Sequence, residues 1–283
     1  MLFQSNEYGS RDKLRKLLID AFSSQNEVYK ICFFGREAEG KHDCYSDIDV
    51  LVFSNDLPKT KAIYKQVFSS ISPIRSVIQL EAHPGGYSEM VQLVDYSPYQ
   101  KVDFSILGEG MCNWNQYVVY QNQNKPINYH QKLEDIPITH DIGYLNKEIM
   151  FSVARFTKCL FRHDIDMYRR WTNISVTALA LLYEKHFGWK LEIDKSSLGS
   201  SGTKRLYDDL ESDERSFVEK IRPSDGKLDI LLSYQSSIEL IIELSRQKAQ
   251  HFDIMLDCDF MEYIYSFMIV EMAKYRKQNY ELY

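Results

Sequence analysis

The spacing of hydrophobic residues in the first part of the chain predicts an alternation of helices and strands. Leu14, Leu18 and Phe22 recur at helical spacing after Ser10, a residue type that often caps a helix. Pro58 suits the first turn of a second helix. Apolar runs bounded by turn-forming residues predict strands at 28–34, 48–53, 76–82, 90–96 and 101–107. This order of elements predicts an α/β (α+β) domain, in which a mixed sheet has helices on one side.

The rest of the chain follows a longer hydrophobic period. The polar residues 121–126 and Pro137 end the first pattern. Apolar residues then recur at helical spacing along four stretches, at 145–160, 167–181, 228–244 and 260–272. We interpret the small residues 199–204 as a linker between helices. The second half is therefore predicted to be an all-helical, bundle-like domain. The predicted domains are residues 1–135 and 136–283.

Composition narrows the class of protein. The chain has 283 residues, of which 44% are hydrophobic and 26% charged, as expected of folded domains rather than disordered segments. Its five cysteines are scattered and indicate neither a disulfide framework nor a zinc site. No apolar run approaches the about 20 residues of a membrane span, and no signal peptide is evident. We expect a cytoplasmic protein without a membrane partner, and the net charge of -6 disfavours nucleic acid.

Two aspartates stand out at the start of the second predicted strand. The strand period of two places Asp47 and Asp49 on one face, while Ile48 and Val50 point to the core. Neighbouring carboxylates repel each other unless a divalent cation lies between them. Oxygen ligands of this kind suit Mg²⁺. The pattern therefore predicts a site for one or two magnesium ions.

A later strand repeats this pattern with one carboxylate. Val102 and Phe104 point inward there, and Asp103 lies on the opposite face. If this strand pairs beside the first, three carboxylates converge and form a site able to hold two metal ions. Asp95, on the neighbouring predicted strand, competes with Asp103 for this position. An Asp-X-Asp sequence alone is more often a solvated strand end. The prediction of a metal site therefore depends on finding the paired aspartates in an apolar strand, a glycine at the end of the strand before it, and a third aspartate in a later strand.

The loop before the paired aspartates carries a resemblance to a known family. Within the stretch from Gly35 to Asp49, the residues Gly40, Asp43 and 45–49 stand at the spacing of a known sequence signature. This stretch resembles the signature of the nucleotidyltransferase superfamily that includes DNA polymerase β, and specifically of its antibiotic-modifying branch, the lincosamide and aminoglycoside nucleotidyltransferases. The resemblance implies a polymerase-β-like catalytic domain, residues 1–135, followed by a helical substrate-binding domain, residues 136–283.

The resemblance also implies roles for individual residues. It implies that Asp47, Asp49 and Asp103 are catalytic and bind two Mg²⁺ ions, and that Gly35 is the phosphate-loop glycine. The family normally has serine after that glycine, whereas this chain has Arg36, whose guanidinium can bind phosphate bidentately. The expected nucleotide contacts are Gly35, Arg36 and Ser46.

The general base is left open among three carboxylates. Asp103 and Asp95 are candidates in the first domain, and Glu148 is a candidate on the first helix of the second. A solvated helix residue is the commoner interpretation of Glu148.

The expected reaction moves a nucleoside monophosphate, AMP from Mg-ATP, onto a hydroxyl of a small-molecule antibiotic such as a lincosamide or an aminoglycoside, and releases pyrophosphate. One alternative is the same chemistry on a protein or RNA acceptor. Another is a degenerate domain that only binds nucleotide, for which Arg36 is the one argument. The sequence indicates neither the modified hydroxyl nor the oligomeric state.

Overall fold

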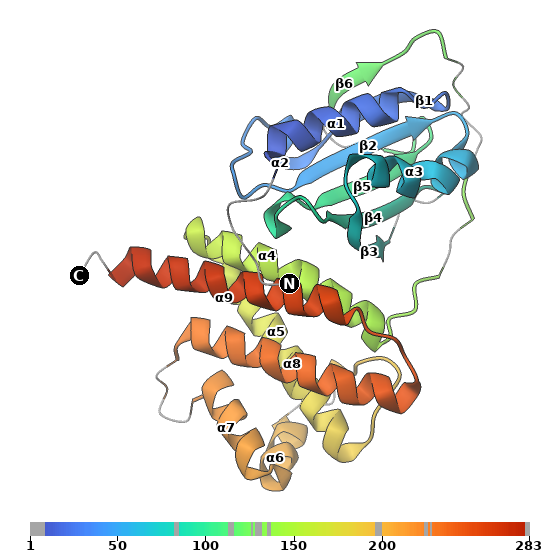
Figure 1. The fold of residues 1–283 in the computed structure, drawn as a ribbon. Coiled ribbons are helices and arrows are strands. Elements are labelled where there is room, and N and C mark those ends of the chain that lie inside the picture. The colour runs from blue at the N-terminus through green and yellow to red at the C-terminus, as the bar shows by residue number, and fades with distance from the viewer. Residues whose placement is uncertain are drawn as a thin grey trace. The chain divides into compact units, whose positions relative to one another are not determined.

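The chain divides into two compact units. The computed structural model describes residues 9–81, 85–112, 116–125, 127, 132–134, 137–195, 200–223, 226 and 228–280. The first unit extends from residue 4 to 138, and the second from residue 139 to the C-terminus. We call them the sheet unit and the helical unit (Figure 1). The boundary predicted between residues 135 and 136 falls outside the described residues.

The sheet unit is built on a mixed sheet with strand order β3-β4-β5-β2-β1-β6 (Figure 1). Its strands are β1 (Val28–Phe33), β2 (Ile48–Ser54), β3 (Ile74–Leu80), β4 (Tyr87–Leu93), β5 (Val102–Leu107) and β6 (Tyr117–Gln121). Its helices are α1 (Arg11–Ser23), the short α2 (Gly35–Ala38) and α3 (Leu57–Ile71), with a 3-10 turn at Pro98–Gln100. β2 and β5 pair in parallel, and the other neighbouring strands are antiparallel. The predicted fold class is confirmed.

Helices α1 and α3 cover one face of this sheet. Ser10 caps α1 by accepting a hydrogen bond from the backbone N–H of Lys13. Phe22 of α1 stacks on Phe104 of β5 with ring centroids 5.1 Å apart, and Phe68 of α3 meets the same ring edge-on. Aromatic contacts of these two geometries stabilise a core beyond the area that they bury. The main hydrophobic core therefore lies between the two helices and the sheet.

The sheet departs from the prediction at two places. β4 ends at Leu93, so Asp95 lies in the turn after it and not on a strand. β6 was not predicted; it is a strand at the edge of the sheet and pairs with β1, for example through Lys30 and Gln121. Residues 117–120 are β-branched or aromatic, a composition that favours a strand, so the sequence did contain a signal for β6.

The helical unit contains the four long helices that the hydrophobic period predicts. Its helices are α4 (Ile142–Phe161), α5 (Asp166–Phe187), α6 (Ser200–Asp209), α7 (Ser212–Ile221), α8 (Ile230–Phe252) and α9 (Cys258–Tyr280). α5 ends at Phe187 and is followed by its C-cap Gly188, with a φ of 117°, where the sequence predicted the helix to close. The interpretation of 199–204 as a linker is wrong for residues 200–204, which begin α6; residue 199 is outside the described residues. Leu206 and Leu210, both buried, anchor this segment.

A buried ion pair joins two helices of this unit. The Nζ of Lys248 on α8 lies 2.7 Å from Oε2 of Glu184 on α5, and both side chains are closed to solvent. The backbone N–H groups of Lys190 and Asp194 donate to the same carboxylate.

Within the part of the chain that the structure describes, no helix is both long and apolar enough to cross a membrane.

Candidate active site

The three predicted aspartates come together at the N-terminal ends of β2 and β5. These strands are parallel neighbours, and Asp49 stands directly opposite Asp103 in their register. Asp47 immediately precedes β2. One carboxylate oxygen from each of the three residues lies within 4.8 Å of the other two. The strand pairing on which the predicted convergence depended is therefore present. We call Asp47, Asp49 and Asp103 the carboxylate group.

The carboxylate group has the chemistry of a divalent cation site. The side chains of Asp47 and Asp103 are only 15% and 17% exposed, so water screens their mutual repulsion poorly. Carboxylate oxygens are the hard ligands that Mg²⁺ and Mn²⁺ prefer. The three residues fit a divalent metal, whose identity the geometry leaves open.

A lysine that the sequence analysis did not single out lies inside this group. Lys101 is 2% exposed, and its Nζ lies 3.1 Å from Oδ2 of Asp47 and forms an ion pair with Oδ1 of Asp103. It precedes Asp103 by two residues, and the strand period therefore places both side chains on one face. That spacing was the available signal, but the approach to Asp47 depends on the pairing of β2 with β5.

Gly35 has a structural role next to Asp49. Its φ is +59°, in the left-handed region that favours glycine, and an added Cβ would lie 2.6 Å from Oδ2 of Asp49. The backbone N–H of Phe34 also donates to the carbonyl oxygen of Asp49, at 3.1 Å. A side chain at position 35 would therefore collide with a carboxylate of the group. The expected contact of Gly35 with a triphosphate stays a prediction.

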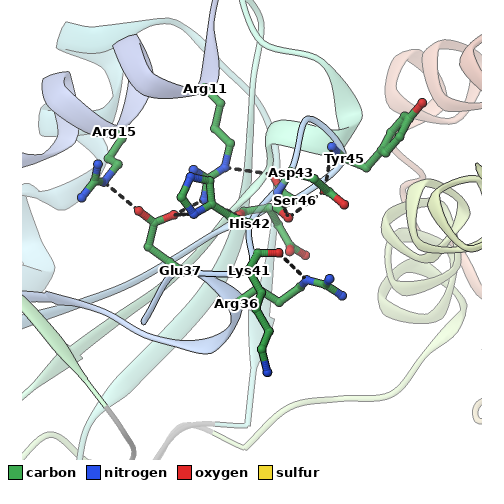
Figure 2. Close-up of polar contacts among 10 residues, drawn as sticks. Arg11, Arg15, Arg36, Glu37, Lys41, His42, Asp43, Tyr45 and Ser46 are labelled. Atoms are coloured by element: carbon green, nitrogen blue, oxygen red, sulfur yellow. Dashed lines mark hydrogen bonds and ion pairs between the residues drawn. The ribbon is translucent and has the colours of Figure 1, made fainter. Parts of the chain in front are cut away.

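The loop before Asp47 is held by its own hydrogen bonds (Figure 2). Ser46 is buried, and its hydroxyl donates to Oδ1 of Asp43 at 2.9 Å and accepts from the backbone N–H of Asp43 at 3.0 Å. The backbone N–H of Tyr45 donates to the same carboxylate oxygen. These bonds give Ser46 a place in the conformation of the loop, while its expected contact with nucleotide is untested.

An arginine of α1 fastens the same loop to the body of the sheet unit (Figure 2). Arg11 is buried and donates from Nε to the carbonyl oxygen of Ser46, at 3.3 Å, and from Nη2 to that of Asp47, at 3.2 Å. Its charge is balanced by Glu37, which also lies 2.9 Å from Nε of Arg15. Sequence reasoning missed Arg11 and Glu37, because their partners lie far away in the sequence. They position the main chain that carries Asp47.

The remaining candidates are Arg36 and Asp95 in the sheet unit and Glu148 in the helical unit. Arg36 is exposed on α2, and its Nε donates to the carbonyl oxygen of Lys41 at 3.2 Å (Figure 2). Asp95 is exposed in the turn after β4 and is not a member of the carboxylate group, so its predicted competition with Asp103 for the metal site is wrong. Glu148 is exposed on α4 of the helical unit. Its role as a base stays a prediction.

A comparison with protein families identifies the sheet unit. Residues 15–125 match the family model described as "Nucleotidyltransferase domain", and this range includes the whole carboxylate group. The chain contains a nucleotidyltransferase domain. It is thereby an enzyme of the nucleotidyl-transferring class, and the superfamily resemblance found in residues 35–49 is confirmed.

The nucleotidyltransferase domain and the helices after it also have similar solved structures. One is an aminoglycoside 6-adenyltransferase from Bacillus subtilis, at 12% identity over 93% of this chain and 99% of that chain, with a TM-score of 0.35. Another is a spectinomycin adenyltransferase from Enterococcus faecialis, solved with ATP and spectinomycin, at 16% identity over 84% and 97% of the two chains, with a TM-score of 0.24.

A third similar structure is that of a synthase and not of an adenyltransferase. It is a STING-associated c-di-GMP synthase from Capnocytophaga granulosa, at 18% identity over 85% of this chain and 80% of that chain, with a TM-score of 0.25. Similarities this low identify no substrate. A search of curated protein sequences found no match to this chain.

Proposed function

We propose that this nucleotidyltransferase moves a nucleoside monophosphate, AMP from Mg-ATP, onto a hydroxyl of a small-molecule antibiotic such as a lincosamide or an aminoglycoside. The observation that carries the transfer reaction is the carboxylate group, Asp47, Asp49 and Asp103, inside a nucleotidyltransferase domain. The acceptor class is supported by the resemblance of residues 35–49 to the antibiotic-modifying branch. A net charge of -6 also suits a cationic acceptor better than a nucleic acid.

The proposed chemistry is an in-line displacement at phosphorus. The acceptor hydroxyl oxygen attacks the α-phosphorus, the bond from that phosphorus to the oxygen bridging to the β-phosphate breaks, and pyrophosphate leaves. Divalent metal held by the carboxylate group would neutralise charge on the triphosphate and make the acceptor hydroxyl more acidic. In this proposal Asp103 takes the hydroxyl proton, with Glu148 as the alternative base.

Other residues position the reactants in this proposal. Gly35 leaves room for the Asp49 carboxylate, and Arg36, which follows it in the chain, binds a phosphate of the triphosphate through its guanidinium. Arg11 keeps the end of that loop in place through the carbonyl oxygen of Asp47. The helical unit supplies the binding surface for the acceptor.

The proposal is tested with the full chain, magnesium, and ATP or GTP labelled at the α-phosphate. The purified protein is incubated with a panel of lincosamides and aminoglycosides, and the label is followed onto the drug. Asp49→Asn removes a charge of the carboxylate group with little change in volume, so we expect it to abolish labelling. Asp20→Asn is the matched control, because Asp20 is an exposed aspartate of α1 in the same unit and is not a member of the group. We expect it to label the drug as the wild type does.

Each alternative gives a different pattern in the same assay. Label in a dinucleotide, a protein or an RNA, lost in Asp49→Asn, would retain the site but replace the acceptor. Nucleotide binding without transfer to any acceptor would favour a degenerate domain. Transfer that survives in Asp49→Asn would refute the assignment of the site itself.

A further inference from the structure

Lys101 is a buried cation in direct contact with two members of the carboxylate group. Its Nζ lies 3.1 Å from Oδ2 of Asp47 and forms an ion pair with Oδ1 of Asp103, with only 2% of the side chain exposed. These are oxygens of the same residues that would hold a divalent metal. A lysine in this position is therefore more than a solvated neighbour of the site.

The charge balance of the group explains why a lysine is found there. The three carboxylates converge within 4.8 Å and repel each other strongly in a poorly solvated place. One ammonium among three carboxylates offsets part of that repulsion. A divalent cation would offset it as well, but the ammonium and the cation would share the same oxygens.

We propose that Lys101 is a built-in counter-ion, which keeps Asp47 and Asp103 together when no metal is bound and competes with metal for their oxygens. This proposal rests on the metal-binding part of the proposed function. Lys101 is a positioning residue in this scheme, since it acts through the carboxylates. The competition lowers the affinity of the group for metal alone, so that metal is held firmly only when a triphosphate adds its own oxygens and negative charge.

The main-chain role of Lys101 is separable from the role of its side chain. Its carbonyl oxygen accepts from the backbone N–H of Ile48 at 3.0 Å and thereby helps to set the register of β2 beside β5. That bond survives any substitution of the side chain. A change at position 101 therefore tests the ammonium and leaves the strand pairing in place.

The test is a Mn²⁺ titration of the nucleotide-free full chain, with free Mn²⁺ followed by electron paramagnetic resonance. Lys101→Met keeps the length of the side chain and removes the charge, so we expect it to bind Mn²⁺ about tenfold more tightly than the wild type. Lys101→Arg keeps the charge and is the matched control, expected to bind Mn²⁺ as the wild type does. Asp49→Asn identifies binding outside the carboxylate group.

Thermal unfolding supplies a second readout, because loss of a purely structural lysine would change Tm by the same amount with and without metal. In the presence of EDTA, Lys101→Met should have a lower Tm than the wild type, because the carboxylates lose their counter-ion. In saturating Mn²⁺ that difference should shrink or disappear. If Lys101→Met does not fold, Lys101→Gln replaces it with the same expectations.

The outcomes separate this proposal from the proposed function. Wild-type and Lys101→Met protein binding Mn²⁺ with equal affinity, or a Tm difference that is the same with and without Mn²⁺, overturns the counter-ion and leaves the metal site intact. Absence of Mn²⁺ binding in both proteins overturns the counter-ion together with the metal site. Tighter binding in Lys101→Met, lost when Asp49→Asn is added, supports both.

Discussion

Two buried lysines, one in each unit, show how the same charge serves different purposes. Lys248 faces one carboxylate, that of Glu184, and both are closed to solvent. Two backbone N–H groups complete the hydrogen bonding of Glu184. Lys101 instead faces a group of three carboxylates, two of which it contacts, and those two keep some exposure to water. The first arrangement pairs one lysine with one carboxylate away from solvent, while the second sets one lysine among three carboxylates that stay partly accessible to a cation.

The contrast shows that burial of a charge does not by itself mark a functional site. A balanced buried pair is fully accounted for by its partners and leaves nothing for a ligand to satisfy. A buried lysine among several partly exposed carboxylates leaves carboxylate oxygens that a cation can bind. The following changes test that distinction.

The largest expected effect is on the balanced pair. Lys248→Met leaves the Glu184 carboxylate buried without its counter-ion, so we expect a loss of about 3–5 kcal/mol in the free energy of unfolding. Urea unfolding measures this loss, which should be the same with and without Mg²⁺. Adding Glu184→Gln should recover much of it, because the second charge is then also removed. A loss below about 1 kcal/mol would contradict the reading of this pair as a balanced structural unit.

An intermediate effect is expected at Gly35, because an added side chain there would collide with Asp49 of the carboxylate group. Gly35→Ala would place a Cβ 2.6 Å from Oδ2 of Asp49, and a misplaced reactive group lowers kcat/KM by about 10²-fold. Gly40→Ala is the control, since Gly40 also has a positive φ, +67°, but nothing within 4 Å of an added Cβ. The positive φ should cost each variant about 1–2 kcal/mol of stability, and Gly35→Ala should lose more than Gly40→Ala because of the overlap with Asp49. Equal activity in the two variants would show that backbone strain, and not Asp49, decides the outcome.

The smallest effect is expected in the loop before the group. Ser46→Ala removes the hydroxyl that bonds twice to Asp43, which should lower the free energy of unfolding by about 1 kcal/mol. Transfer activity should fall less than in Gly35→Ala, because Arg11 still holds the main chain at Asp47. Ser70→Ala, at an exposed position of α3, is the control in chemical denaturation, and we expect it to change the free energy of unfolding less than Ser46→Ala does. Activity as low as that of Gly35→Ala would instead point to a direct contact of Ser46 with the nucleotide.

The sequence predicted those features of the site that depend on local periodicity. The alternation along 47–53 and 101–107 placed Asp47, Asp49 and Asp103 on the faces that the structure gives them. It left open whether the two strands are neighbours, because strand order is decided by tertiary packing. It also placed β4 three residues too late, at 90–96 and not at 87–93, and thereby put Asp95 on a strand.

What the sequence did not predict depends on contacts between distant residues. Arg11 and Glu37 are separated along the chain and meet only when α1 packs beside the loop. Lys101 is conspicuous only once β2 and β5 are paired. In the helical unit, the small residues 200–204 were interpreted as a linker, whereas the burial of Leu206 and Leu210 stabilises a helix there.

The parallel pairing of β2 and β5 has a consequence for how the protein matures during synthesis. β1 and β2 leave the ribosome early, but the strand that completes the carboxylate group is made only after α3, β3 and β4. Contacts between segments so far apart form late, because the intervening chain must first be closed into a loop. A nascent chain that has not yet reached β5 lacks Asp103 and Lys101 alike. The carboxylate group and the lysine that contacts it are thus completed in one step, when this strand docks beside β2.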